Sequence, residues 1–143
     1  MKIIFDYNRT IFDPEADNLY PGVLDVLRRL SEKYELFLVS RNEPARKKRF
    51  EKLNIKSYFQ KIIFVDKKSK QLFKEIAGDT KDVLVVGDSI GDEIKIGNQL
   101  GLVTVRFKKG KFALKIPKDT DESAQFEITD IYELENIILR YEK

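Results

Sequence analysis

The sequence predicts a doubly wound α/β domain, in which helices cover both faces of a mainly parallel sheet of five strands or slightly more. Short apolar runs, typical of buried parallel strands, alternate along the chain with segments whose apolar residues recur every three to four positions, as in amphipathic helices. The length of 143 residues suits one domain with a substantial core. We therefore expect a three-layer sandwich formed by a single domain over residues 1–143.

The first half of the chain predicts three strands and two helices. Strands are expected at Lys2–Asp6, Glu35–Ser40 and Lys61–Val65, which are short and rich in branched or aromatic residues. A helix is expected from Val23 to about Lys33, because its apolar residues have helical spacing: Val23, Val26, Leu27 and Leu30. A second helix is expected from about Pro44 to Leu53.

The second half continues the alternation. Ser69 is a good helix cap and precedes a helix with Leu72, Phe73 and Ile76 on its inner face. The most apolar strand is expected at Asp82–Asp88, followed by a helix from about Gly91 to Leu100 and a strand at Leu102–Phe107. A small sixth strand is expected at Phe126–Ile128, after a long loop over Lys108–Ser123. Asp130 and Glu133 predict the start of a final helix, whose inner face would be Leu134, Ile137, Ile138 and Tyr141.

Composition limits the chemistry. The chain has no cysteine and no histidine, which excludes disulfides, thiol catalysis and imidazole bases. The net charge of +3 says little about partners. No apolar run approaches the roughly 20 residues of a membrane span, and no signal-peptide pattern follows Met1, so we expect a cytoplasmic protein without membrane contact.

Polar residues gather just after the predicted strands. In doubly wound sheets, ligands bind beyond the carboxyl ends of the strands, where the strand order reverses. Alternate residues point the same way in an extended backbone, so Asp6, Asn8 and Thr10 would converge if the chain stays extended after the first strand. The other residues placed at this edge are Ser40, Arg41, Lys67, Lys68, Asp88, Asp92 and Glu93.

These residue types predict a site for a metal and an anion. Asp6 and Asp88 would end neighbouring strands, and two nearby carboxylates repel each other unless a proton or a cation intervenes. Oxygen ligands suit Mg²⁺, and either Asp92 or Glu93 could complete its shell. A hydroxyl at Ser40, an ammonium at Lys67 or Lys68 and nearby backbone amides would face an anion, for which phosphate is the natural candidate.

The same residues resemble the motifs of the haloacid dehalogenase superfamily, a Rossmann-like fold. Residues 3–13, I-I-F-D-Y-N-R-T-I-F-D, are similar to its first motif, hhhDxDGT; F-L-V-S at 37–40 is similar to the second. The Lys67-Lys68 pair resembles the third motif, and V-V-G-D-S-I-G-D-E at 85–93 the fourth. Only short segments separate the motifs where the family inserts a cap domain, so the chain resembles a capless member.

The resemblance implies a magnesium-dependent phosphatase that cleaves a phosphate monoester or acyl phosphate through an aspartyl-phosphate on Asp6. It implies metal ligands at Asp6, Asp88, the backbone carbonyl of Asn8, and Asp92 or Glu93. Phosphate contacts would come from Ser40, Arg41 and Lys68, with Lys67 as the alternative to Lys68, and Thr10 would brace the loop. The implied partner is a phosphorylated small molecule or macromolecule, and a homo-oligomer fits an open site.

The sequence departs from the family motif at Asn8, where most phosphatases of this family have an aspartate that acts as general acid and base. An amide orients a group but does not exchange a proton near neutral pH. Three outcomes stay open: another group or water transfers the proton, the substrates are restricted to activated phosphates, or the chain is an inactive phosphate-binding, metal-binding or protein-interaction module. The basic run Arg46-Lys47-Lys48-Arg49 is interpreted as a solvated helix face, and no nucleic-acid partner is expected.

Overall fold

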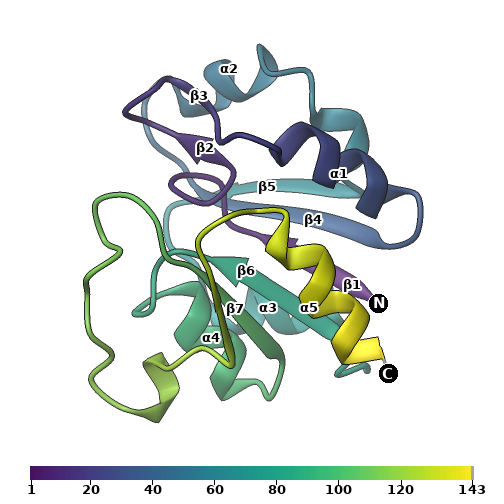
Figure 1. The fold of residues 1–143 in the computed structure, drawn as a ribbon, viewed down its shortest axis with the longest axis vertical. Helices are drawn as coiled ribbons and strands as arrows, with labels where there is room; N and C mark the ends of the chain where they lie inside the picture. Colours follow the sequence, from purple (N-terminus) through teal and green to yellow (C-terminus); the bar gives the residue numbers. More distant parts are fainter. Residues whose placement is uncertain (143) are drawn as a thin grey trace.

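The fold is built on one parallel sheet, seen in the computed structural model, which describes residues 1–142 (Figure 1). The sheet has six strands in the order β5-β4-β1-β6-β7-β8, and every neighbouring pair in it is parallel. The strands are β1 (Lys2–Phe5), β4 (Glu35–Arg41), β5 (Lys61–Val65), β6 (Val83–Gly87), β7 (Val103–Phe107) and β8 (Phe126–Ile128). The chain winds outward from β1 in both directions, so the predicted doubly wound fold, including its small sixth strand, is confirmed.

Helices cover both faces of this sheet. They are α1 (Val23–Ser31), α2 (Arg46–Glu51), α3 (Lys70–Ala77), α4 (Glu93–Gln99) and α5 (Glu133–Glu142), with 3-10 turns at η1 (Lys56–Tyr58) and η2 (Thr120–Glu122). Successive side chains of a strand point to opposite faces. Ile3 therefore packs in a cluster with α1 and α5, whereas Ile4 packs in a second cluster with α3 and α4. Side chains of β1 are therefore buried on both faces of the sheet, which anchors the strand that precedes Asp6.

Three local features differ from the predictions. An antiparallel hairpin of β2 (Phe12–Asp13) and β3 (Asn18–Leu19) lies between the first strand and the first helix, where no strand was predicted. The helix predicted from Gly91 begins at Glu93, because residues 89–92 form a turn. Tyr141, expected on the inner face of the last helix, is exposed, since the buried residues of α5 end at Ile138.

A buried arginine holds the long loop after β7. The guanidinium of Arg106 is inside the protein and donates hydrogen bonds to the carbonyl oxygens of Phe112 (3.1 Å), Ala113 (3.3 Å) and Lys115 (2.8 Å). These three hydrogen bonds to one guanidinium hold residues 112–115 in place, although this part of the loop has little regular structure. No helix among residues 1–142 is both long and apolar enough to span a membrane.

Candidate active site

A cleft of about 280 Å³ lies at the carboxyl ends of β1, β4 and β6, where the strand order reverses. It is lined by seven of the residues predicted from the sequence: Asp6, Asn8, Arg41, Lys68, Asp88, Asp92 and Glu93. The remaining wall is formed by Arg9, Glu43, Arg46, Ser89, Ile90, Phe112 and Lys115. The cleft is therefore rich in both acids and cations.

A tight turn, and not an extended backbone, brings Asp6 and Thr10 together. The carbonyl of Tyr7 accepts hydrogen bonds from the backbone N–H groups of Thr10, Ile11 and Phe12, at 3.0–3.3 Å. Arg9, with a φ of 63°, reverses the chain. The fully buried Thr10 hydroxyl then donates to Asp6 Oδ2 at 3.0 Å. Asp6 and Thr10 therefore come together as predicted, and Asn8 lines the cleft with Asp6, but Thr10 does not line it, and the extended conformation expected for the segment is wrong.

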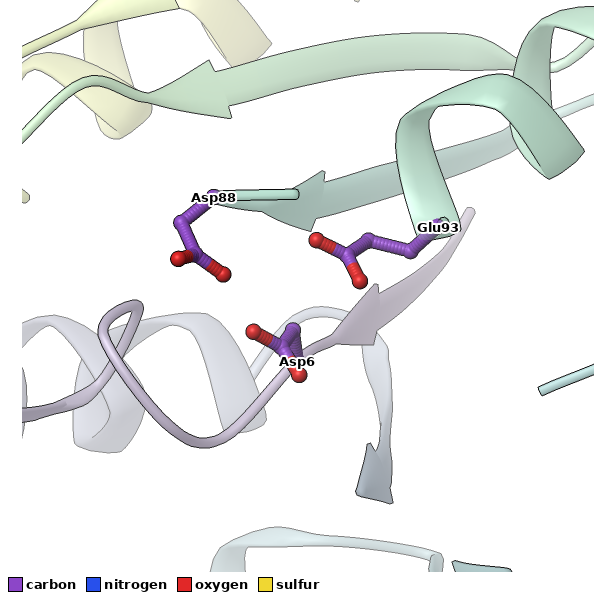
Figure 2. A group of neighbouring side chains, drawn as sticks. All are labelled: Asp6, Asp88 and Glu93. Atoms are coloured by element: carbon purple, nitrogen blue, oxygen red, sulfur yellow. The ribbon is translucent and has the colours of Figure 1, made fainter. Parts of the chain in front are cut away.

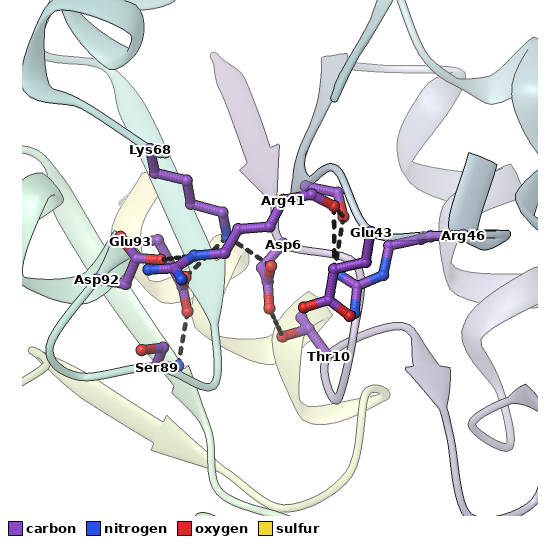
Figure 3. A network of polar contacts seen from close by, with 10 residues as sticks. Asp6, Thr10, Arg41, Glu43, Arg46, Lys68, Ser89, Asp92 and Glu93 are labelled. Atoms are coloured by element: carbon purple, nitrogen blue, oxygen red, sulfur yellow. Dashed lines mark hydrogen bonds and ion pairs between the residues drawn. The ribbon is translucent and has the colours of Figure 1, made fainter. Parts of the chain in front are cut away.

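Lys68 connects the end of β1 with the start of α4 (Figure 3). Its buried ammonium lies 2.5 Å from Asp6 Oδ1 and 2.9 Å from Glu93 Oε1. Burial opposes the charge on Lys68, but the Asp6 and Glu93 carboxylates outweigh this effect and raise the pKa of the ammonium above its ordinary value. The Ser69 hydroxyl accepts the N–H of Leu72 and starts α3 directly after Lys68.

Lys67, the alternative to Lys68, is exposed and is not among the residues that line the cleft. The two lysines are consecutive, and the turn before α3 directs only the second one inward. The ambiguity left by the sequence is therefore resolved in favour of Lys68 as the lysine in the cleft.

Asp6, Asp88 and Glu93 form a cluster of acids that fits a divalent cation (Figure 2). One carboxylate oxygen from each lies within 4.8 Å of the others. Burial, followed by the charges of its acidic neighbours Asp6 and Glu93, raises the pKa of Asp88 to about 9. Burial, followed by the charge of Asp6, raises the pKa of Glu93 to about 7. Asp88 and Glu93 therefore resist ionisation in the absence of a cation, and hard oxygen donors of this kind suit Mg²⁺.

Glu93, and not Asp92, belongs to this cluster. Glu93 Oε2 accepts the backbone N–H of Ser89 at 2.6 Å, so together with Lys68 both of its oxygens have partners. Gly87 makes room for it, since a Cβ there would lie 2.3 Å from the Glu93 carboxylate. Asp92 instead faces Arg41 at 3.4 Å across the cleft. Asp6 and Asp88 are thus the acids best placed to bind a cation directly, with Glu93 orienting Lys68.

Ser40 does not line the cleft, although the sequence placed it there. Its side chain is fully buried, and its hydroxyl donates to the carbonyl of Arg41 at 3.1 Å. The Arg46 guanidinium contacts this hydroxyl, with Nη1 at 3.5 Å from Ser40 Oγ, and its Nη2 donates a hydrogen bond to Glu43 Oε2 at 2.9 Å.

Arg46 lines the cleft but was assigned to a solvated helix face by sequence reasoning. The available signal was its position at the start of the helix after β4, because first turns of such helices lie at the carboxyl edge of the sheet. Arg9 also lines the cleft, between Glu15 at 2.6 Å and the ring of Phe112 at 5.5 Å.

Comparison with known proteins gives the family and the fold of the chain. A family model described as haloacid dehalogenase-like hydrolase matches residues 2–107. A curated relative, glyceraldehyde 3-phosphate phosphatase of Methanopyrus kandleri, is 27% identical in an alignment of 130 positions that covers 83% of this chain and 56% of the relative. This chain thus spans little more than half the length of that relative.

Solved structures share the fold. The D,D-heptose 1.7-bisphosphate phosphatase of B. bronchiseptica, complexed with magnesium and phosphate, superposes with a TM-score of 0.74 at 15% identity, over 98% of each chain. A HAD phosphatase from Thermococcus onnurineus superposes with a TM-score of 0.67 at 21% identity, over 84% of this chain and 58% of that one.

Proposed function

The chain belongs to the haloacid dehalogenase-like hydrolase family, and we propose that it is a magnesium-dependent phosphatase that works through an aspartyl-phosphate on Asp6. One observation carries the proposal. Asp6 is held by Thr10 on one oxygen and Lys68 on the other, and it faces Asp88 in a cleft at the strand ends. Hydrogen bonds on both oxygens fix the carboxylate in one orientation, as a nucleophile requires.

The reaction has two displacements at phosphorus. A carboxylate oxygen of Asp6 forms a bond to phosphorus while the bond to the leaving oxygen breaks, and that oxygen departs with the electron pair. Water then attacks the phosphorus of the aspartyl-phosphate, loses a proton to solvent, and releases inorganic phosphate with the free Asp6 carboxylate.

The residues around Asp6 balance charge. Lys68 and Arg41 supply positive charge near the phosphoryl oxygens, which gain negative charge density as the bond to the leaving group stretches. Mg²⁺ held by Asp6, Asp88 and the backbone carbonyl of Asn8 would add to this electrostatic stabilisation. Glu93 keeps Lys68 directed at Asp6 through its 2.9 Å contact.

Asn8 restricts the leaving group. It lines the cleft two residues after the nucleophile, and its amide has no proton to give to a departing alkoxide. General acid–base help is worth about 10²–10⁴ in rate, and the loss is greatest for leaving groups of high pKa. We therefore expect aryl and acyl phosphates to be hydrolysed faster than alkyl phosphates.

Asn8 also supports a second candidate function. A chain that keeps the acids, Lys68 and the fold but has no acid–base residue could bind phosphate and metal without turnover. The two functions differ in a single measurement, the catalysed release of phosphate.

The test is magnesium-dependent phosphate release from an aryl phosphate, an acyl phosphate and an alkyl phosphate. Asp6→Asn should abolish turnover, because the amide is a poor nucleophile, whereas Asp79→Asn, at an exposed aspartate outside the cleft, should not change it. Asn8→Asp should raise turnover of the alkyl phosphate by about 10²–10⁴ and that of the acyl phosphate much less. No turnover by the wild type or by Asn8→Asp on any substrate would reject the phosphatase and leave the binding function.

A further inference from the structure

A second cavity adjoins the candidate active site. It measures about 250 Å³ and shares three lining residues with the first cleft: Asn8, Glu43 and Arg46. Its other walls come from the turn after β1, from the β2 hairpin and from α2. A ligand seated at Asp6 that extends past Asn8 and Arg46 therefore enters this second cavity.

Two arginines line the second cavity, and their carboxylate partners are at the surface. Arg46 pairs with Glu43 at 2.9 Å, and Arg49 pairs with Asp17 at 2.9 Å. The side chains of Glu43 and Asp17 are 58% and 66% exposed. Ion pairs this exposed contribute little to stability, so an incoming anion can replace either carboxylate at small cost.

The buried Tyr7 hydroxyl is a further polar group beside this cavity. The Tyr7 side chain lines the cavity and is 1% exposed, yet its hydroxyl has no hydrogen-bond partner among the described residues. Stacking on Phe12 (5.1 Å) and Phe50 (5.8 Å) fixes the ring. The positive charges of Arg46 and Arg49 act on this hydroxyl, although burial dominates and raises its pKa to about 12. A buried tyrosine hydroxyl normally has a partner, and a ligand oxygen would supply one.

We propose that Arg46, Arg49 and Tyr7 form a second anion subsite, so that the substrate is a phosphomonoester with a further phosphate or carboxylate on its leaving portion. The inference rests on the proposed function only in assuming that the phosphate of the substrate binds at Asp6. Arg46 lies in both cavities and would contact the substrate between its two anionic ends. Two guanidinium groups and a hydroxyl donor match the oxygens of either anion.

The test uses three phosphonates that cannot be hydrolysed and that share a three-carbon chain: propylphosphonate, 3-phosphonopropionate and 1,3-propylenediphosphonate. Their affinities are measured by calorimetry with Mg²⁺ present. The second and third ligands carry an anionic group at each end. We expect them to bind at least tenfold more tightly than propylphosphonate, which is about the gain expected of one charged hydrogen-bonded contact. The better of the two identifies the second anion as phosphate or carboxylate.

Variants locate the effect. Arg49→Gln and Tyr7→Phe should reduce the tenfold preference to about twofold or less while the affinity for propylphosphonate stays unchanged. Lys52→Gln removes the same charge from the exposed end of α2, outside both cavities, and should keep the preference. Tyr7→Phe should melt at the same temperature as the wild type or higher, since the hydroxyl has no hydrogen-bond partner among residues 1–142.

The subsite would be overturned if the wild type bound all three phosphonates equally or bound none of them. It would also be overturned if Arg49→Gln and Lys52→Gln lost the preference for the ligands with two anionic ends to the same extent. Because these ligands report binding without turnover, a preference found in a protein that releases no phosphate would reject the phosphatase and keep the subsite. Release of phosphate by a protein that binds all three phosphonates equally would support the phosphatase and reject the subsite.

Discussion

Without a bound cation, the stability of this protein should fall as the pH rises. The pKa of Asp88 is raised from an ordinary 3.8 to about 9, and that of Glu93 from 4.5 to about 7. Between the ordinary and the raised value, the folded protein holds a proton that the unfolded chain has released. The folded state therefore binds more protons than the unfolded state, and the free energy of unfolding decreases with increasing pH.

The magnitude follows from the number of protons. One extra proton bound by the folded state gives a slope of about 1.4 kcal/mol per pH unit. Between pH 5 and pH 7, Asp88 alone should therefore lower the free energy of unfolding by about 2–3 kcal/mol, and Glu93 adds to this. At about 3–4 °C per kcal/mol for a chain of this size, the melting temperature should fall by about 6–12 °C. Bound Mg²⁺ favours the ionised acids and should remove most of the fall.

The assay is thermal unfolding at pH 5, 6 and 7, with a chelator and with Mg²⁺. Asp88→Asn, which has no ionisable group at this position, should show a shallower fall with the chelator than the wild type. A melting temperature that stays level or rises from pH 5 to pH 7 with the chelator would refute the reasoning. An identical slope in Asp88→Asn would show that this acid is not the source.

Three further substitutions test the supports of the site. Lys68→Met leaves two buried carboxylates without their cation and should cost about 3–5 kcal/mol, measured by denaturant unfolding; a change under 1 kcal/mol would contradict the contact. Gly87→Ala places a methyl group against the Glu93 carboxylate and should weaken Mg²⁺ binding by about 10–100-fold in calorimetry, whereas an unchanged affinity would mean that Glu93 does not support the metal site. Arg106→Met removes the donor to three loop carbonyls and should speed tryptic cleavage within residues 108–115. A cleavage rate equal to that of the wild type would show that other contacts hold this segment.

The convergence of Asp6, Asp88 and the Lys67-Lys68 segment could be predicted from sequence because it depends on topology. Each residue directly follows a strand or lies in the turn after it, and parallel strands place their carboxyl ends at one edge. No knowledge of turn geometry is needed for that step. The apolar runs of β1, β5 and β6 and the helical stripes around them were sufficient.

Choices between adjacent residues could not be predicted, because they depend on backbone dihedral angles in turns. Glu93 enters the acid cluster and Asp92 does not, since the turn over residues 89–92 delays the start of α4. The β2–β3 hairpin was missed for a related reason: two-residue strands are too short to show a period. Arg46 was missed because its helix resembles a charged surface, and only the tertiary position of its first turn places it at the cleft.

The charges of the site explain why a metal and a phosphate should bind together. Asp6, Asp88 and Glu93 with Lys68 leave an excess of two negative charges when all four are ionised, which repels a phosphate dianion. A divalent cation cancels that excess, and the phosphate then meets Arg41 and Arg46 without opposition from the acids. The phosphate in turn supplies oxygen ligands that the three carboxylates alone do not provide. Each ligand therefore raises the affinity of the other by the same factor, as linkage requires.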